Sequence, residues 1–169
     1  MRTFRILTTF LFATLLLACN NKNTDFEDKL AKLQKENDSI ANVQNQIKQE
    51  HTAMMKQHEE FMEEISSGNL SDSTLVRDMA QHEVMLKKQD AVIKANDELM
   101  QGHNQLKQDF ATLPEAEKEA QLKEMMDDHD RIMKDQDMLQ KEIEQMKDEH
   151  SKMRENLSTQ NKNEATTTS

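Results

Sequence analysis

Residues 26–65 read FEDKLAKLQKENDSIANVQNQIKQEHTAMMKQHEEFMEEI. Two columns of side chains run through this stretch, each at the seven-residue spacing that defines the heptad repeat of coiled coils. One column is entirely apolar, whereas the other is apolar at its ends and polar in the middle. The pattern predicts a helix about 60 Å long that packs on other helices with a left-handed twist. The apolar column is Phe26, Leu33, Ile40, Ile47, Met54 and Phe61, and the mixed column is Leu30, Asn37, Gln44, His51, His58 and Ile65.

Two later segments carry a mixed column of the same kind. Gly68 lies in a serine-rich link after the first segment, and Pro114 lies between the second and the third. Because both links are short, consecutive helices should fold back on one another. The sequence therefore predicts an all-α fold, an antiparallel three-helix coiled-coil bundle with long helices at about 26–66, 72–110 and 113–157. The later mixed columns are Leu75, His82, Gln89, Asn96, His103 and Phe110, and then Leu122, His129, Gln136, Ile143, His150 and Leu157.

The positions of the two links predict how the mixed columns stack. With turns centred near residues 70 and 112, antiparallel pairing joins residues whose numbers sum to about 140 and about 225. Most polar side chains then meet other polar side chains inside the bundle. The predicted layers are His58/His82/Ile143, His51/Gln89/Gln136, Gln44/Asn96/His129 and Asn37/His103/Leu122.

Two hypotheses explain these buried polar groups. In the first they are structural, because a buried polar side chain costs stability but penalises a slip in register. In the second, His58 and His82 bind Cu(I), because a methionine precedes each by one turn and thioether with imidazole suits that ion. Packing alone also explains methionines in such positions. The structural polar core comprises Asn37, Gln44, His51, Gln89, Asn96, His103, His129 and Gln136, and the copper cluster would comprise His58, His82, Met55, Met62 and Met79.

Composition and motifs argue against several classes of function. The chain has 22 Lys and Arg against 32 Asp and Glu, a formal net charge of -10, which disfavours binding to nucleic acid. It contains no Glu-x-x-His pair, no glycine-rich phosphate loop and no G-x-S-x-G motif. We therefore expect a protein that is not an enzyme and that needs no cofactor, with Cu(I) as the alternative.

The first 19 residues, MRTFRILTTFLFATLLLAC, have the order of parts found in an export signal. Arg2 and Arg5 precede an apolar run that is too short for an ordinary membrane span. Leu16-Leu17-Ala18-Cys19 then resembles the lipobox of bacterial lipoproteins. That resemblance implies a signal peptide over residues 1–18 and a diacylglyceryl group on Cys19. Cys19 is the one cysteine of the chain, so the chain offers it no disulfide partner.

The lipoprotein resemblance also implies a location and an anchor. Asn20, rather than Asp, follows the lipidated cysteine, which by the sorting rule of that family favours the outer membrane, with its periplasmic face preferred over the cell surface. The resemblance implies several acyl chains, palmitate among them, which would give a stable anchor in the lipid. Residues 19–25 are predicted to form a lipidated tether and residues 158–169 a disordered tail, because neither has apolar side chains to bury.

The whole chain resembles small helical envelope lipoproteins that carry the label "viral A-type inclusion protein". The phrases that carry this likeness are His51-Thr52-Ala53-Met54-Met55 and His129-Asp130-Arg131-Ile132-Met133. The resemblance implies a non-enzymatic structural or interaction module of the cell envelope, with a possible protein partner there. Copper binding and a stress-chaperone role are the alternatives. A monomeric bundle is favoured over a homo-oligomer of hairpins.

Overall fold

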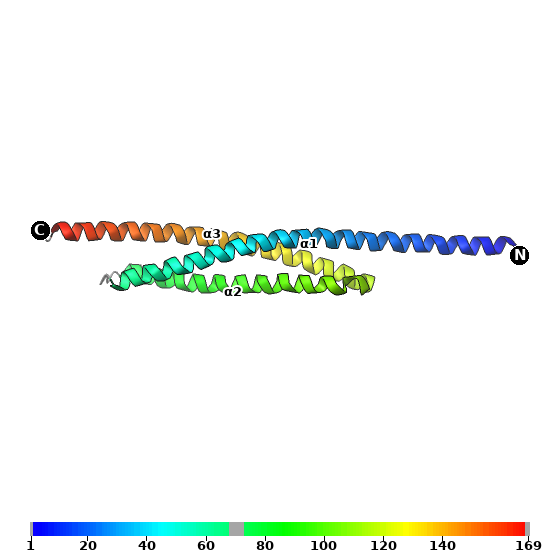
Figure 1. Ribbon diagram of the computed structural model, residues 1–169, viewed down its shortest axis with the longest axis horizontal. Helices are drawn as coiled ribbons and strands as arrows, with labels where there is room; N and C mark the ends of the chain where they lie inside the picture. Colours follow the sequence, from blue (N-terminus) through cyan, green and yellow to red (C-terminus); the bar gives the residue numbers. More distant parts are fainter. Residues whose placement is uncertain (1, 68–72, 168–169) are drawn as a thin grey trace.

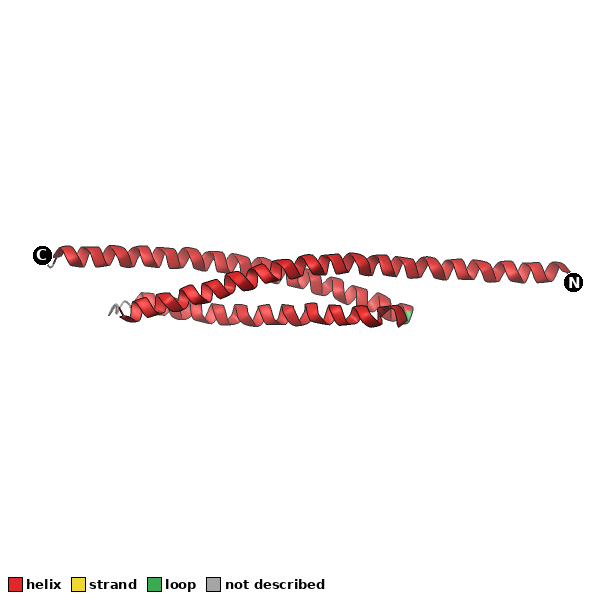
Figure 2. Ribbon diagram, viewed as in Figure 1, coloured by secondary structure: helices red, strands yellow, loops and turns green. Residues whose placement is uncertain are grey.

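The computed structural model describes the backbone of residues 2–67 and 73–167 and the side chains of residues 24–67, 74–106 and 108–159. It consists of α1 (Arg2–Ser67), α2 (Ser73–Asp109), the short 3-10 helix η1 (Phe110–Thr112) and α3 (Glu115–Thr167). α2 runs antiparallel to α1 and α3, which extend beyond it in opposite directions (Figure 1). The described residues contain no strand (Figure 2). All three helices pack on one another, so the predicted all-α three-helix bundle is confirmed.

The α2–α3 connection follows from one proline. Leu113 adopts an extended conformation, with φ -71° and ψ 148°, as expected for a residue that precedes proline. The carbonyl oxygen of Pro114 accepts hydrogen bonds from the backbone N–H groups of Glu117 and Lys118, both at 3.0 Å. Pro114 therefore opens α3 at a position where its missing N–H is not needed. The link predicted around Gly68 lies among residues 68–72, outside the described residues.

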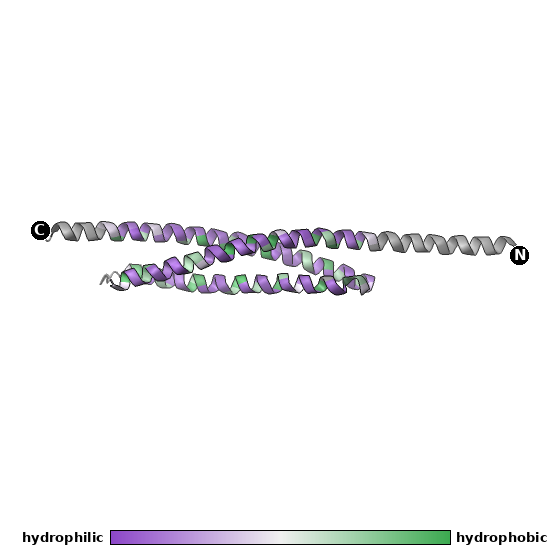
Figure 3. Cartoon of the chain, viewed as in Figure 1, coloured by the Kyte–Doolittle hydropathy of each residue, from purple (hydrophilic) through white to green (hydrophobic). Residues whose placement is uncertain are grey.

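Apolar layers alternate with polar ones along the bundle axis. Figure 3 shows mainly hydrophilic colour along the helices, with hydrophobic patches where they pack together. The region of the chain that the structure describes contains no helix with an apolar stretch long enough to cross a membrane. Three buried apolar layers lie between the polar ones: Met54/Leu86/Met146, Ile47/Ile93/Leu139 and Ile40/Met100/Ile132.

The register of α1 against α2 is as predicted, but the predicted register of α3 was wrong by one heptad. His150, and not Ile143, lies beside His82, and Gln136 bonds to Gln44 instead of lying beside His51. The prediction centred the second turn at residue 112. In the structure, α3 pairs with α2 one heptad later in its own sequence, so Leu122 packs near Phe110 and His129 lies beside His103. This register brings His150 to His58 and His82, whereas Ile143 packs with Ile47, Ile93 and Leu139.

Two predicted boundaries differ from the structure. Residues 19–25, expected to be a loose tether, are part of α1, and α3 continues through residues 158–167, expected to be part of a disordered tail. The prediction relied on the lack of apolar side chains to bury. A helix satisfies its backbone hydrogen bonds internally, and neither stretch contains a glycine or proline that would interrupt them.

Candidate functional site

The mixed columns of the three helices meet along the bundle axis. The eight residues predicted as a structural polar core are all buried. His58, His82 and His150 are buried with them. Apolar side chains close both ends of this stack, around Phe110 at one end and Phe61 at the other. The polar groups therefore lie in an interior from which water is largely excluded.

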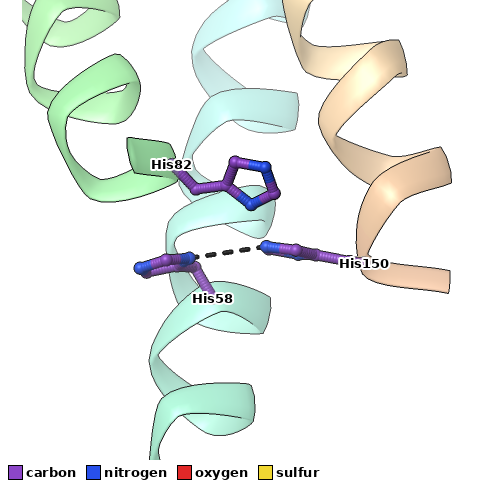
Figure 4. A group of neighbouring side chains, drawn as sticks. All are labelled: His58, His82 and His150. Carbon is purple, nitrogen blue, oxygen red and sulfur yellow. Dashed lines mark hydrogen bonds between the residues drawn. The ribbon is translucent and has the colours of Figure 1, made fainter. Parts of the chain in front are cut away.

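Three imidazoles meet in one layer, to which each helix contributes one. His58 comes from α1, His82 from α2 and His150 from α3 (Figure 4). The ring centroids are 6.3 Å apart for His58 and His82, 5.5 Å for His58 and His150, and 4.9 Å for His82 and His150. One ring nitrogen of each histidine lies within 4.8 Å of a ring nitrogen of both others. We call this group the histidine triplet.

Hydrogen bonds define which nitrogens of the histidine triplet are free. Nε2 of His82 lies 2.6 Å from Oε2 of Glu149. The carboxylate accepts, so Nε2 carries the hydrogen and Nδ1 of a neutral ring holds a free lone pair. That Nδ1 is buried without a hydrogen-bond partner among the described residues. Nδ1 of His58 and Nε2 of His150 face each other at 3.4 Å.

Burial favours the neutral form of two of these imidazoles, those of His58 and His150. Desolvation, followed by the neighbouring His82 and His58, lowers the pKa of His150 to about 4. Desolvation and the same His82 also lower the pKa of His58. A hydrogen bond from Gln145, followed by one from His82, lowers the pKa of Glu149. At neutral pH the layer therefore combines the neutral imidazoles of His58 and His150 with the ionised carboxylate of Glu149 at its edge.

A second layer repeats this arrangement at the other end of the bundle. The rings of His103 and His129 lie 5.2 Å apart. Nε2 of His103 lies 3.1 Å from Oδ2 of Asp128, just as His82 contacts Glu149, and in both layers the carboxylate belongs to the residue before the α3 histidine. Burial lowers the pKa of His129, although Glu36, whose Oε2 lies 3.5 Å from its Nδ1, opposes the shift. Asn37 occupies the mixed-column position of α1 that corresponds to His58.

Amide side chains fill the layer in the centre of the bundle. Nε2 of Gln44 donates to the backbone oxygen of Ile93 at 3.0 Å, and Nε2 of Gln136 donates to that of Ile40 at 2.9 Å and to Oε1 of Gln44 at 3.1 Å. These bonds cross between helices. They fix the axial register of α1, α2 and α3, because sliding one helix by one residue would break these hydrogen bonds.

Asn96 differs from the two glutamines of its layer. Both polar atoms of its side chain are buried without a hydrogen-bond partner among the described residues. We expect Asn96→Val to raise the free energy of unfolding by about 1–2 kcal/mol, because it removes unsatisfied polar atoms from the interior. Urea denaturation followed by circular dichroism measures the change. Gln136→Val is the matched control, with an expected loss of about 1–3 kcal/mol. If both substitutions destabilised the protein equally, the Asn96 side chain would not be the unsatisfied polar group described above.

The structure brings together only part of the predicted copper cluster. His58 and His82 lie in one layer. Met79 and Met62 pack in the apolar cluster around Phe61, and the side chain of Met55 is 49% exposed. Packing therefore accounts for Met79 and Met62, whereas Met55 lies on the surface, at a groove that His58 and Met62 also line.

The third imidazole of the layer, His150, was missed by the sequence analysis. His150 belongs to the mixed column of the third segment, so its seven-residue spacing already indicated a buried position. The error of one heptad in the register of α3 placed Ile143 in its position.

The fold and the site define a class of protein: a three-helix bundle with buried histidine and amide layers. Comparison with protein-family models, with curated proteins and with solved structures finds no match for the chain.

Proposed function

We propose that the chain is a lipid-anchored, non-enzymatic module of the bacterial cell envelope, in which the bundle serves as a rod of fixed length. The layered interior carries this proposal. Hydrogen bonds such as that from Gln136 to the backbone of Ile40 tie the helices to one alignment. A bundle with a single register keeps a constant length and a constant outer surface, which suits a spacer or a docking element.

The outer surface of the bundle supports a role in interaction rather than catalysis. Exposed ion pairs along single helices include Lys29 with Asp25, Lys87 with Glu83 and Lys94 with Asp90, each at 2.6 Å. Such pairs contribute little to stability, about 0.3–0.5 kcal/mol each. They give the rod a charged face that keeps it soluble and can contact a protein partner. The three helices of one chain bury the core side chains among themselves, which favours a monomer.

The anchor is the part of the proposal that is most directly tested. In bacterial cells supplied with labelled palmitate, we expect the chain to take up the label on Cys19 and to lose residues 1–18. Cys19→Ser should abolish labelling and leave the precursor at its full mass, because no other cysteine can accept the lipid. Mass spectrometry of the purified protein measures both effects.

Asn20→Asp is the matched control for the anchor. It should keep the label on Cys19 but move the protein from the outer to the inner membrane in a density gradient. An unlabelled wild-type chain, or equal labelling of Cys19→Ser, would overturn the proposed anchor.

A further inference from the structure

We propose that His58, His82 and His150 bind a single tetrahedral transition-metal ion, for which zinc is the probe, with one position left for water. The proposal goes beyond the role of the bundle as a rod. It depends on the geometry of the histidine triplet, on the free lone pairs in it and on the contrast with the second histidine layer.

The distances within the triplet are close to those of a three-histidine zinc site. Zinc–nitrogen bonds of about 2.0–2.1 Å at tetrahedral angles place two ligand nitrogens about 3.3 Å apart. Nδ1 of His58 and Nε2 of His150 are 3.4 Å apart. The longest of the three ligand separations is 4.8 Å at most, so the remaining adjustment is about 1.5 Å. Rotation of one ring about its side-chain torsions would provide it.

The hydrogen-bonding pattern also matches that of a metal site. A histidine that binds a metal usually donates its other N–H group to a carboxylate, which fixes the tautomer and raises the basicity of the ligand nitrogen. His82 makes this bond to Glu149 at 2.6 Å. Its free Nδ1 is buried and has no other partner among the described residues. Metal binding would give that lone pair a partner.

Access favours binding as well. A groove of about 710 Å³ reaches His58, and Met55 and Leu86 also line it. The groove provides an entry path for the ion and a source of the water ligand. Three imidazoles suit Zn(II) and similar borderline ions, and no thioether is needed.

The second histidine layer provides an internal comparison. His103 and His129 are also buried, and His103 also bonds to a carboxylate, that of Asp128. The α1 residue at the corresponding position is Asn37, whose amide is a poor ligand for zinc. Carboxylates of Glu36 and Asp128 contact its two imidazoles, but among the described residues only the triplet brings three ligand atoms within 4.8 Å of one another, so this layer should bind zinc more weakly. Loss of His103 should therefore leave zinc binding to the triplet intact.

The experiment titrates the full chain, purified in detergent and freed of metal with a chelator, with Zn(II). Thermal unfolding is followed by circular dichroism, and calorimetry gives the stoichiometry. We expect one equivalent to bind and the Tm to rise by roughly 5–10 °C at a zinc concentration one hundred times the Kd. Co(II) serves as a spectroscopic probe, because tetrahedral Co(II) gives a far stronger visible absorption than the hydrated ion.

The variants His58→Gln, His82→Gln and His150→Gln remove one ligand each. Glutamine already occupies mixed-column positions at Gln44, Gln89 and Gln136, so the bundle should tolerate it. Each variant is expected to lose the Tm rise and the cobalt absorption, whereas His103→Gln keeps both. A wild-type chain without these responses would overturn the site. So would variants of the triplet that respond like the wild type, or a response lost equally in His103→Gln.

If a triplet variant does not fold, a second measurement keeps the site testable. The histidine side-chain resonances of the folded wild type are recorded by NMR during titration with Zn(II). Selective shifts of the His58, His82 and His150 rings support the site. Shifts spread over all six histidines, or confined to His103 and His129, would contradict it.

Discussion

Lowering the pH of the metal-free protein from 7 to 4.5 is expected to reduce its free energy of unfolding by about 2–3 kcal/mol through His150 alone. The pKa of His150 is about 4 in the folded state and 6.5 in the unfolded chain. The unfolded state therefore binds the extra proton first. The stabilisation is complete above pH 6.5 and is lost as the pH falls from 6.5 towards 4. His58, whose pKa is also lowered by burial, should contribute in the same direction.

Urea denaturation at pH 7, 6 and 4.5 in the presence of a chelator measures this dependence. His150→Gln is the control, because it removes the titrating ring and should have a shallower pH profile than the wild type. The interval ends at pH 4.5 to limit protonation of neighbouring carboxylates such as Glu149. A wild-type stability that stays constant, or rises, between pH 7 and 4.5 would show that the imidazoles are not held neutral by burial.

Replacing Phe61 with alanine is expected to lower the free energy of unfolding by about 3–5 kcal/mol, because it opens a cavity in a fully buried site. The Phe61 side chain is 0% exposed and lies in the apolar cluster that closes one end of the polar stack. Its ring contacts that of His150 edge-on, with centroids 5.7 Å apart, and the guanidinium of Arg154 lies 5.3 Å from its centroid. The substitution therefore removes apolar packing at this end of the bundle and the ring contact that supports His150.

The control for Phe61→Ala, Met55→Ala, lies six residues away on the same helix. Met55 is 49% exposed, so Met55→Ala should change the free energy of unfolding by no more than about 0.5 kcal/mol. Thermal and urea unfolding of both variants measure the difference. A loss below about 1 kcal/mol in Phe61→Ala would mean that this end of the bundle is open to solvent.

The histidine triplet and the amide layer serve different purposes within one design. The bond from Gln136 to Gln44 joins two helices directly and fixes their alignment. The triplet instead brings three imidazoles together with few hydrogen bonds among them, and this leaves lone pairs available for a ligand. The same column of residues can therefore hold the rod in register and carry a metal ion.

Much of the fold followed from residue spacing alone. A seven-residue repeat fixes which face of a helix is buried, because side chains that recur at that interval lie on one stripe. The burial of Asn37, Gln44 and His129 was therefore predictable without knowing which helix each of them packs against. The position of Pro114 at the start of the third helix was predictable for a similar local reason, since proline is tolerated in a first turn.

The composition of the site was not predictable in the same way. His58 and His82 could be paired because the predicted register of α1 against α2 was correct. His150 was missed because a repeat of identical spacing permits several registers that differ by whole heptads, and the conformation of the α2–α3 link selects one of them. The repeat constrains the position of α3 only to multiples of seven residues.

The number of helices, their buried faces and the polar character of the core could be predicted from residue order, because these features depend on local periodicity. Which polar groups meet depends on how the three helices pack. Three imidazoles share one layer because α3 is shifted by one heptad relative to the alignment predicted from a turn at residue 112. In the observed alignment the apolar side chains at both ends of the bundle also pack together. Contacts between residues as distant as His58 and His150 depend on the summed packing of three helices, and no single segment contains that information.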